Sequence, residues 1–378
     1  MNIVIAPDSF KGSLSAIEAA NAMEKGILKA AGNAEIYKIP MADGGEGTVE
    51  ALITAVGGCI REEEVTGPLG EKVPAFYGIL SDGKTGVIEM AAASGLTLVP
   101  PGKRNPMLAT SYGTGELIRK AIAGGCTRLV VGIGGSATND GGMGMAQALG
   151  VTFFDLKGNE LGFGGQALEY IARIDASGIF EGIRHTEIIV ACDVVNPLCG
   201  KTGASQVFGA QKGATPGMIE KLDQGLLNYA QRIEESLGKS ILDIPGAGAA
   251  GGMGGGIIAF LDGILKPGID IITQTTGLSD RIKAAELIFT GEGRTDFQTA
   301  FGKVPVGISR IAEKYGKPVI CLSGGLGEDI ETLYEQGITA LFSIANRPME
   351  LEEAIKNAET LLCQAAENIM RLYLSARK

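Results

Sequence analysis

The sequence predicts an α/β protein in which both chain ends build a doubly wound parallel sheet and a second α/β domain is inserted in the middle. Short apolar runs typical of buried strands occur near the N-terminus at residues 2–6 and 35–39. Three more occur near the C-terminus at residues 286–290, 317–322 and 338–343. Stretches with apolar residues at helical spacing separate these runs, which is the pattern of parallel strands joined by crossover helices.

The clearest predicted helix lies between the first two strands, at residues 14–31. Ser13 or Ser15 is expected to cap its start, and Glu18 follows Ser15 at the spacing of a capping box. Further helical patterns occupy residues 47–56, 303–315 and 350–376.

The middle of the chain has a different character. Residues 60–90 hold short runs (REEEV, VPAFYGIL and TGVIEM) separated by turns such as Gly67-Pro68 and Asp82-Gly83, which predicts antiparallel hairpins. Residues 110–275 return to alternating helix and strand. We therefore predict one domain made of residues 1–60 and 280–378, and a second α/β domain made of residues 61–279.

The net charge and the histidine content argue against several classes of function. The 378 residues include 33 Lys and Arg against 43 Asp and Glu, a net charge of −10 that disfavours binding to nucleic acid. The single histidine, His185, lies in a polar turn, so we do not expect a His-rich metal site or a Ser-His-Asp hydrolase. Carboxylates or lysines must then carry any acid–base chemistry.

Cysteine usage and the N-terminus indicate where the protein works. The six cysteines show no CxxC spacing, as in proteins of a reducing compartment. Residues 1–10 lack the charged start and cleavage site of a signal peptide. The longest uncharged stretch, residues 244–261, is interrupted by glycines and is a poor membrane span. We expect a cytoplasmic protein that binds neither membrane nor nucleic acid.

Five loops rich in Gly, Ser, Thr and Asp follow predicted strands, at the sheet edge where ligands bind in such folds. The first, residues 6–13, supplies Asp8, Ser9 and Lys11 just before a helix, which suits an anion. A helix cap beside a solvated lysine is the alternative.

The second loop, residues 41–48, places Asp43 before Gly44 and Gly45. The glycines allow a ligand to approach the backbone closely. A flexible turn with capping acids is the alternative.

The third loop, residues 132–142, carries Gly134, Gly135, Ser136, Thr138 and Asn139. Its composition favours a run of amide and hydroxyl groups that cradle phosphate or carboxylate. A competing interpretation is a dinucleotide fingerprint at Gly132, Gly134 and Ala137, with Asp155 eighteen residues beyond Ala137. That match would make the chain an NAD-dependent oxidoreductase of a small hydroxy acid, using Gly132–Ala137.

The fourth loop, residues 191–203, contains Asp193 and a Gly-Lys-Thr that lacks the first glycine of a P-loop. Asp193 suits Mg²⁺ or a substrate hydroxyl, and an Asx turn is the alternative. The fifth loop, residues 290–296, carries Arg294 and Asp296 and resembles a phosphate-and-metal loop. A glycine-rich stretch at residues 246–256 predicts either a loop near a nucleotide or a tight helix–helix approach.

The ordered motifs resemble one known family. APDSFKGSLSA, MADGGEGT, EMAAASGL, SYGTGELI, GIGGSATNDGG, CDVVNPLCG, FGAQKGA and TGEGRTD run in order from residue 6 to residue 296. They are similar to the glycerate kinase type I family over essentially the whole chain. The resemblance implies a flavodoxin-like domain plus an inserted α/β domain, with the active site in the cleft between them. It also implies transfer of the ATP γ-phosphoryl group to D-glycerate with Mg²⁺, and we expect 2-phosphoglycerate rather than 3-phosphoglycerate.

Phosphoryl transfer needs charge neutralisation, a metal ligand, a carboxylate anchor and an acceptor for the hydroxyl proton. We assign catalysis to Asp193, Lys11 and Asp296, with Asp193 and Asp296 also as metal ligands. Asp8, Asp43 and the glycines of the second and third loops complete the predicted binding site. The other binding residues, expected to anchor substrate and phosphate, are Ser9, Ser136, Thr138, Asn139 and Arg294. A non-catalytic sensor would not need so many acid- and hydroxyl-rich loops.

Overall fold

The structure is a computed structural model that describes residues 1–41, 44–301 and 303–377. The chain forms two compact units. The first comprises Met1–Ala42, Glu50–Gly57 and Ile269–Lys378, and the second comprises Asp43–Val49 and Gly58–Gly268. Both chain ends therefore belong to the first unit. The predicted domain limits at residues 60 and 280 stay a prediction, and the two units are described separately below.

The first unit is built on a five-stranded parallel sheet, as predicted. Its strands are β1 (Asn2–Pro7), β2 (Glu35–Lys38), β11 (Leu287–Thr295), β12 (Val319–Leu326) and β13 (Ala340–Ser343). They pair in the order β13-β12-β11-β1-β2, and neighbouring strands run parallel. This order is that of a flavodoxin-like sheet, whose ligand site lies where the order reverses, between the first and third strands along the chain. In this unit that point lies between β1 and β11.

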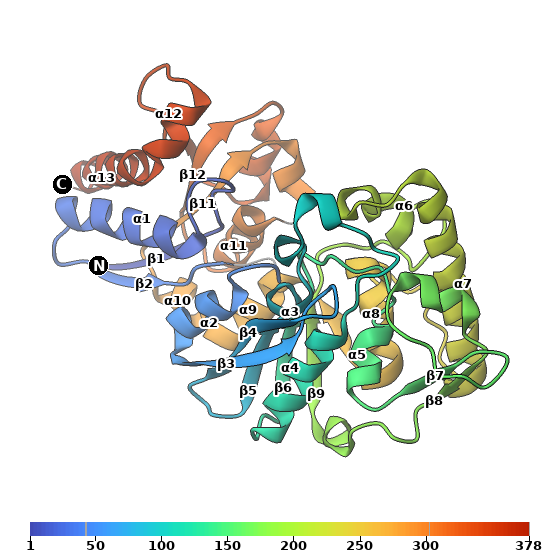
Figure 1. Ribbon diagram of the computed structural model, residues 1–378. Coiled ribbons are helices and arrows are strands. Elements are labelled where there is room, and N and C mark those ends of the chain that lie inside the picture. Colours follow the sequence, from blue (N-terminus) through green and yellow to red (C-terminus); the bar gives the residue numbers. More distant parts are fainter. Residues whose placement is uncertain (42–43, 302, 378) are drawn as a thin grey trace. The chain divides into compact units, whose positions relative to one another are not determined.

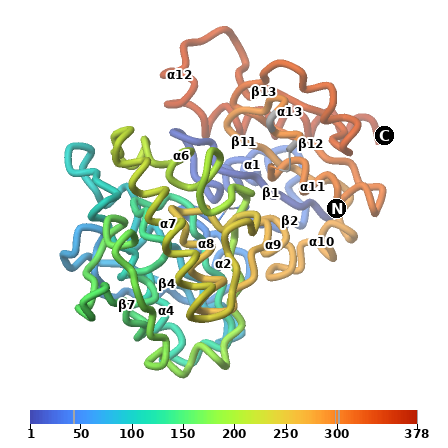
Figure 2. The backbone as a smooth tube through the Cα atoms, turned by 90° about the vertical axis from the view of Figure 1, so that its right-hand side faces the viewer, coloured from blue at the N-terminus to red at the C-terminus, as the bar shows by residue number. Residues whose placement is uncertain are grey.

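Helices cover both faces of this sheet. The apolar sides of α1 (Ala16–Ala30) and α13 (Ala358–Ser375) bury Ile5, Phe289 and Leu322, whereas α11 (Val304–Glu313) packs Val306 against Cys321 on the opposite face. Both views show α1 and α13 side by side (Figures 1 and 2). The remaining helices are α2 (Thr48–Val56), α9 (Gly268–Thr276), α10 (Leu278–Ala284), α12 (Leu351–Lys356) and the 3₁₀ turns Phe297–Phe301 and Ile330–Gln336. The first two residues of α2 belong to the second unit.

The start of α1 confirms the predicted capping box. The Glu18 backbone N–H donates to Ser15 Oγ at 3.2 Å, and the Ser15 N–H donates to Glu18 Oε2 at 2.8 Å. Two otherwise unpaired groups of the first helical turn are thereby satisfied.

The second unit contains a six-stranded mixed sheet. Its strands are β3 (Gly58–Thr66), β4 (Lys72–Leu80), β5 (Thr85–Glu89), β6 (Arg128–Gly132), β9 (Glu187–Ala191) and β10 (Ile264–Lys266). The order is β10-β9-β6-β5-β4-β3. β3, β4 and β5 pair antiparallel, which confirms the predicted hairpins, and β5, β6, β9 and β10 run parallel. A separate antiparallel pair joins β7 (Thr152–Phe154) to β8 (Arg173–Asp175).

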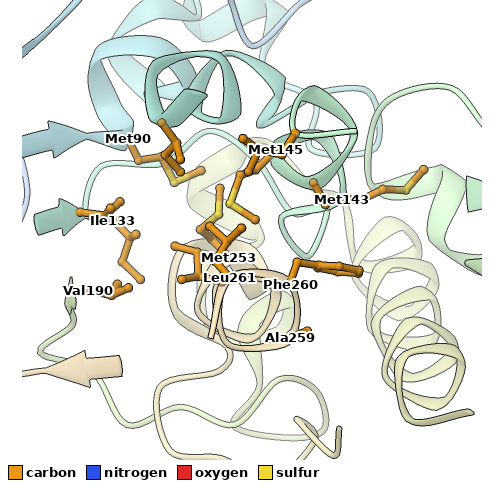
Figure 3. Packing of buried hydrophobic residues seen from close by; sticks show 14 of the residues in the cluster. Met90, Ile133, Met143, Met145, Val190, Met253, Ala259, Phe260 and Leu261 are labelled. Atoms are coloured by element: carbon orange, nitrogen blue, oxygen red, sulfur yellow. The ribbon is translucent and has the colours of Figure 1, made fainter. Parts of the chain in front are cut away.

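Aliphatic side chains make up most of the core of the second unit, and methionine and aromatic side chains pack among them. Met145 and Met253 pack together between two helices, and Phe260 lies beside them (Figure 3). Flexible thioethers suit such irregular spaces, and the chain has no tryptophan to fill them. The helices are α3 (Met90–Ser94), α4 (Tyr112–Ala123), α5 (Met143–Ala148), α6 (Ala204–Phe208), α7 (Pro216–Leu237), α8 (Ala249–Leu261) and 3₁₀ turns at 96–98, 101–103, 165–170, 181–185 and 210–212.

The glycine-rich stretch at residues 246–256 leads into α8 and forms its first part, which is kinked at residues 250–252. A Cβ at Gly256 would overlap the Gly141 carbonyl oxygen, and a Cβ at Gly251 would overlap that of Thr138. Gly251 is also left-handed, with φ +71°, and its carbonyl accepts the Gly141 N–H at 3.0 Å. The glycines therefore let α8 pack closely against the loop after β6, so the close approach joins a helix to a loop rather than two helices. Within the part of the chain that the structure describes, no helix has the length and apolarity to cross a bilayer.

Candidate active site

Three strands of the second unit end at the same edge of the sheet, where the candidate site lies. Glu89, Gly132 and Ala191 are neighbours in register at the carboxyl ends of β5, β6 and β9. The chain segments that follow these residues therefore leave the sheet side by side. This edge is where ligands bind in parallel α/β sheets.

The second and third predicted loops meet here. Gly134 donates its N–H to the Gly44 carbonyl oxygen at 3.0 Å, and a Cβ at Gly134 would lie 2.8 Å from the Gly45 Cα. Gly44 has φ +82° and lies against Ala191, where its own Cβ would come within 2.5 Å of that methyl group. Only glycines allow two backbones to pack this closely. Asp43, predicted beside them, lies outside the described residues.

The loop after β6 is held from both sides. Ser136 forms an isolated antiparallel bridge with Gly95, and the Ala137 N–H donates to the Ser94 carbonyl at 2.9 Å. Ser136 is 7% exposed, and Asn139 is fully buried and donates from Nδ2 to Ser205 Oγ at 2.9 Å. Residues 138–142 precede the helix rather than form its first turn, because α5 begins at Met143.

A buried lysine reaches this loop from elsewhere in the chain. Lys212 ends the 3₁₀ turn at 210–212 and is 2% exposed. Its Nζ donates to Ser136 Oγ at 2.9 Å and to the Thr138 carbonyl at 2.6 Å. Burial lowers the pKa of Lys212 to about 7, although the nearby Asp140 carboxylate opposes this shift. An amino group that can gain or lose a proton near neutral pH therefore contacts two predicted site residues, Ser136 and Thr138.

Asp140 organises the inner end of the same loop. Its Oδ2 accepts Ser111 Oγ–H and the Ser111 N–H, both at 2.8 Å, and its two oxygens accept the N–H groups of Gly142 and Gly144 at 3.2 and 3.3 Å. The carboxyl is completely enclosed, and this burial raises its pKa despite the four donors. Asp140 therefore holds the buried end of the loop through these hydrogen bonds. Its negative charge also acts on Lys212, whose pKa it raises.

Some buried polar atoms of this loop and of α7 have no hydrogen-bond partner among the described residues. Thr138 Oγ1 and Asn139 Oδ1 have no hydrogen-bond partner among the described residues, and neither does the hydroxyl of Tyr229 on α7. Unpaired buried groups are rare in folded proteins and indicate a polar ligand or ordered water. The Thr138 hydroxyl can donate a hydrogen bond, whereas Asn139 Oδ1 can only accept one, so these two atoms suit a hydroxylated ligand or ordered water.

Asp193 lies where predicted, just after β9. Its side chain is exposed, and Oδ1 accepts the Gly268 N–H at 2.9 Å. Asn196 donates instead to the Thr202 carbonyl at 2.8 Å, so it closes its own loop. Asp193 thus presents a carboxylate at the edge that also carries Gly44 and Ser136.

In the first unit, the first predicted loop follows β1. Asp8 Oδ1 accepts the Ser9 N–H at 2.7 Å, and the Phe10 N–H donates to the Leu14 carbonyl at 2.8 Å to close a tight turn. Lys11 stands exposed on that turn. The turn leads directly into α1, so it combines a cation with a helix N-terminus.

The fifth segment differs from its prediction as a loop. β11 runs through Thr295 rather than ending at residue 290, because β12 continues opposite it with Arg294 paired to Gly325. Gly293 makes this extension possible, since a Cβ there would lie 3.2 Å from the Lys11 backbone nitrogen. Arg294 is therefore a strand residue with 74% of its side chain exposed, and its Nε lies 3.4 Å from Asp296 Oδ2.

Glu292 on β11 is a buried carboxylate that the sequence reasoning did not single out. Thr299 Oγ1 donates to its Oε1 at 2.6 Å, and Thr295 Oγ1 does so at 3.1 Å. Lys303 Nζ lies 3.4 Å from Oε2. This network fixes the segment that carries Arg294 and Asp296.

Comparisons with known proteins identify the family. A profile of the glycerate kinase family matches residues 3–374. The chain belongs to the glycerate kinase family. It is 52% identical to the glycerate 2-kinase of Escherichia coli K12 over 369 residues, 98% of this chain and 97% of the relative. A glycerate kinase of Halalkalibacterium halodurans is 51% identical over 97% of both chains. The crystal structure of a putative glycerate kinase 2 from Salmonella typhimurium LT2 superposes with a TM-score of 0.90 at 49% identity, covering 100% of this chain and 99% of that one.

These findings confirm the predicted family, the two-domain α/β fold and an ATP-dependent kinase with an alcohol acceptor. The NAD-dependent alternative is not supported. Asp155, the acidic residue of that match, accepts hydrogen bonds from the N–H groups of Lys157 and Asn159 and from the Asn159 side-chain amide in an exposed turn. Its carboxylate is therefore engaged by its own turn.

The residues present fit a divalent cation held in the way kinases hold Mg²⁺. Among the described residues, no group of three or more His, Cys, Asp or Glu side chains could hold a metal ion. Mg²⁺ in kinases is usually bound by one or two carboxylates plus substrate phosphates, so such a cluster is not required. Asp193 in the second unit and Asp296 in the first each offer carboxylate oxygen, the hard ligand this cation prefers.

Within each unit the structure gathers the predicted residues. Those in the second are Gly44, Gly45, Gly134, Gly135, Ser136, Thr138, Asn139 and Asp193, and those in the first are Asp8, Ser9, Lys11, Arg294 and Asp296. The sequence reasoning missed Lys212 and Asp140. Lys212 lies in the FGAQKGA motif, where a lysine between small residues at the end of a helical segment was the available signal.

Proposed function

We propose that this enzyme transfers the γ-phosphoryl group of ATP to the 2-hydroxyl of D-glycerate, giving 2-phosphoglycerate and ADP, and that it uses Mg²⁺. The observation that carries the proposal is the loop after β6, where Ser136 and Thr138 lie against a buried ammonium. Such a loop suits the carboxylate and hydroxyls of a small hydroxy acid or the oxygens of a phosphate. The choice of the 2-hydroxyl is supported by the relative named glycerate 2-kinase, at 52% identity.

Each candidate residue has a role that its surroundings support. Lys11, exposed beside the N-terminus of α1, would neutralise phosphate oxygens, and Arg294 would add a second cation. Asp193 would orient the substrate hydroxyl and accept its proton, because the only histidine, His185, is exposed in the separate 3₁₀ turn at residues 181–185. Mg²⁺, when bound by Asp193 or Asp296, would supply further charge neutralisation on the β- and γ-phosphates. The six cysteines are free thiols, which supports a cytoplasmic location.

The test is product analysis with purified protein. Incubation with D-glycerate, ATP and Mg²⁺ should release ADP, and EDTA should stop the reaction until Mg²⁺ is restored. A proton-coupled phosphorus NMR spectrum identifies the position, because phosphate on C2 couples to one proton and gives a doublet, whereas phosphate on C3 couples to two and gives a triplet. A triplet would overturn the 2-hydroxyl assignment. Folded protein that releases no ADP would overturn the reaction itself.

A further inference from the structure

Lys212 is an unusual residue to find buried in the second unit. It is 2% exposed, and taking an ammonium out of water costs several kcal/mol unless its partners repay that cost. Its hydrogen-bond partners are one hydroxyl, Ser136 Oγ, and one carbonyl, that of Thr138. Neither partner carries a charge. Asp140 stabilises the ammonium by Coulomb attraction, without a hydrogen bond to it. An apolar side chain would fill this space at lower cost, so the charge itself calls for an explanation.

We propose that Lys212 is a positioning residue whose ammonium fixes the Ser136 hydroxyl as a hydrogen-bond donor toward an anionic oxygen of the substrate, either a carboxylate or a phosphoryl oxygen. An ammonium has three donors and no acceptor, so Ser136 Oγ must accept from it. The hydroxyl hydrogen is then left for another partner. This inference rests on the proposed function, because it assumes that the loop after β6 binds substrate.

The backbone of this loop is held independently of Lys212. Ser136 bridges Gly95, the Ala137 N–H bonds the Ser94 carbonyl, and Asn139 bonds Ser205. Removing the ammonium should therefore leave the loop in place and change mainly the direction of one hydroxyl. This distinguishes a positioning role from a purely structural one.

The proton on Lys212 decides that direction. A neutral amine has a lone pair that accepts the Ser136 O–H and turns the hydrogen inward, away from the substrate. Asp140 of the loop is the charged side chain that favours the protonated form, and burial, the larger effect, holds the pKa of Lys212 at about 7. Tyr229, on α7, lies in the field of Asp140 and stays neutral because burial raises its pKa well above the usual value. Arg104 lies beside the next residue, Gly213, through its backbone and Cβ.

Two consequences follow for substrate binding. Because the protonated form binds the anion, affinity should fall as the pH rises above about 7 and Lys212 loses its proton. Because a bound anion favours the ammonium, binding at pH 8, where free Lys212 is mostly neutral, should take up a proton from solution.

The experiment compares Lys212→Met, Ser136→Ala and the double variant with the wild type, with Lys221→Met, an exposed lysine on α7, as the control. KM and kcat for D-glycerate and for ATP are measured from pH 6.5 to 9, and folding is checked by circular dichroism. Proton uptake is measured by calorimetry at pH 8 in two buffers of different ionisation enthalpy. Separate titrations with D-glycerate alone and ATP alone show which anion contacts Ser136.

We expect Lys212→Met to raise the KM of one substrate about tenfold or more, the usual scale of a hydrogen bond to a charged group, with a smaller change in kcat. In the Ser136→Ala background the same substitution should change that KM less than about twofold, because Lys212 acts through Ser136. Lys221→Met should behave as wild type. Equal effects of Lys212→Met in both backgrounds would overturn the proposal.

The role of Lys212 can also be tested with the wild type alone. The test therefore remains possible if the Lys212→Met protein does not fold. The KM of the wild type for one substrate should rise between pH 7 and 9, and that ligand should bind with proton uptake at pH 8. A KM that stays flat for both substrates, or binding of both without proton uptake, would overturn the role of Lys212 while leaving kinase activity intact. Absence of turnover in folded wild type would instead overturn the proposed function.

Discussion

At the scale of single residues, Asp193 is the sharpest test of the chemistry. It follows β9, its side chain is exposed, and one oxygen accepts the Gly268 N–H at 2.9 Å. Asparagine would keep that hydrogen bond and the shape of the loop while removing the negative charge. We therefore expect Asp193→Asn to lower kcat at least about a hundredfold, within the range of general acid–base groups, while the protein stays folded and binds ATP. Steady-state kinetics and circular dichroism measure the two effects.

Asp155→Asn is the matched control. Asp155 also accepts backbone N–H groups in an exposed turn of the second unit, but its turn lies at the end of β7. Its kcat should stay within about twofold of wild type, since exposed substitutions away from a site rarely matter. If Asp193→Asn is as active as this control, Asp193 is only a turn former and Asp296 becomes the candidate for the acid–base role.

At the scale of elements, the contact between α1 and α13 depends on one glycine. A Cβ at Gly26 would overlap the Cys363 carbonyl oxygen and lie 3.0 Å from the Ala366 Cβ. Because the clash is with backbone, the two helices would have to move apart to accept a methyl group. We expect Gly26→Ala to lower the free energy of unfolding by roughly 1–3 kcal/mol, the usual cost of overpacking, although alanine favours helix more than glycine does.

Urea unfolding measures this change, with Gly32→Ala as the control. A Cβ at Gly32 would lie 3.6 Å from the Leu28 carbonyl oxygen, an ordinary contact, so that variant should be nearly neutral. Gly26→Ala as stable as Gly32→Ala would mean that α13 can shift at no cost and does not lock α1 against the sheet.

At the scale of the whole molecule, ligand binding should appear as a shift of the melting temperature. A ligand at one hundred times its Kd stabilises the native state by about 2.7 kcal/mol, which corresponds to a few degrees for a chain of this size. We expect MgATP to produce this shift because the chain belongs to a kinase family. NAD⁺ should leave the melting temperature unchanged, because the Asp155 carboxylate is occupied by its own turn.

Differential scanning fluorimetry at several ligand concentrations measures the shift, and its size should grow with the logarithm of ligand concentration above Kd. Stabilisation by NAD⁺ equal to that by MgATP would contradict the assignment of the loop after β6 to phosphate or carboxylate. A melting temperature that ignores ATP would contradict ATP binding itself.

The amino-acid sequence by itself determined the parallel sheet of the first unit, the hairpins at β3 to β5 and the cap of α1. Each of these depends on local signals. Apolar runs and helical spacing set the elements, and Ser15 with Glu18 sets a boundary within four residues. The sequence also located the loop after β6, because Gly, Ser, Thr and Asn in that density suit neither a strand nor a buried helix turn.

Only the tertiary structure decided which of the loop's polar residues are buried and what holds them. Lys212 contacts Ser136 across 76 residues of chain, and Asn139 contacts Ser205 across 66. The extension of β11 through Arg294 likewise depends on β12, a partner about thirty residues away. No local pattern encodes such pairs, because the free energy of burying an ammonium or extending a strand is set by groups that only folding brings together.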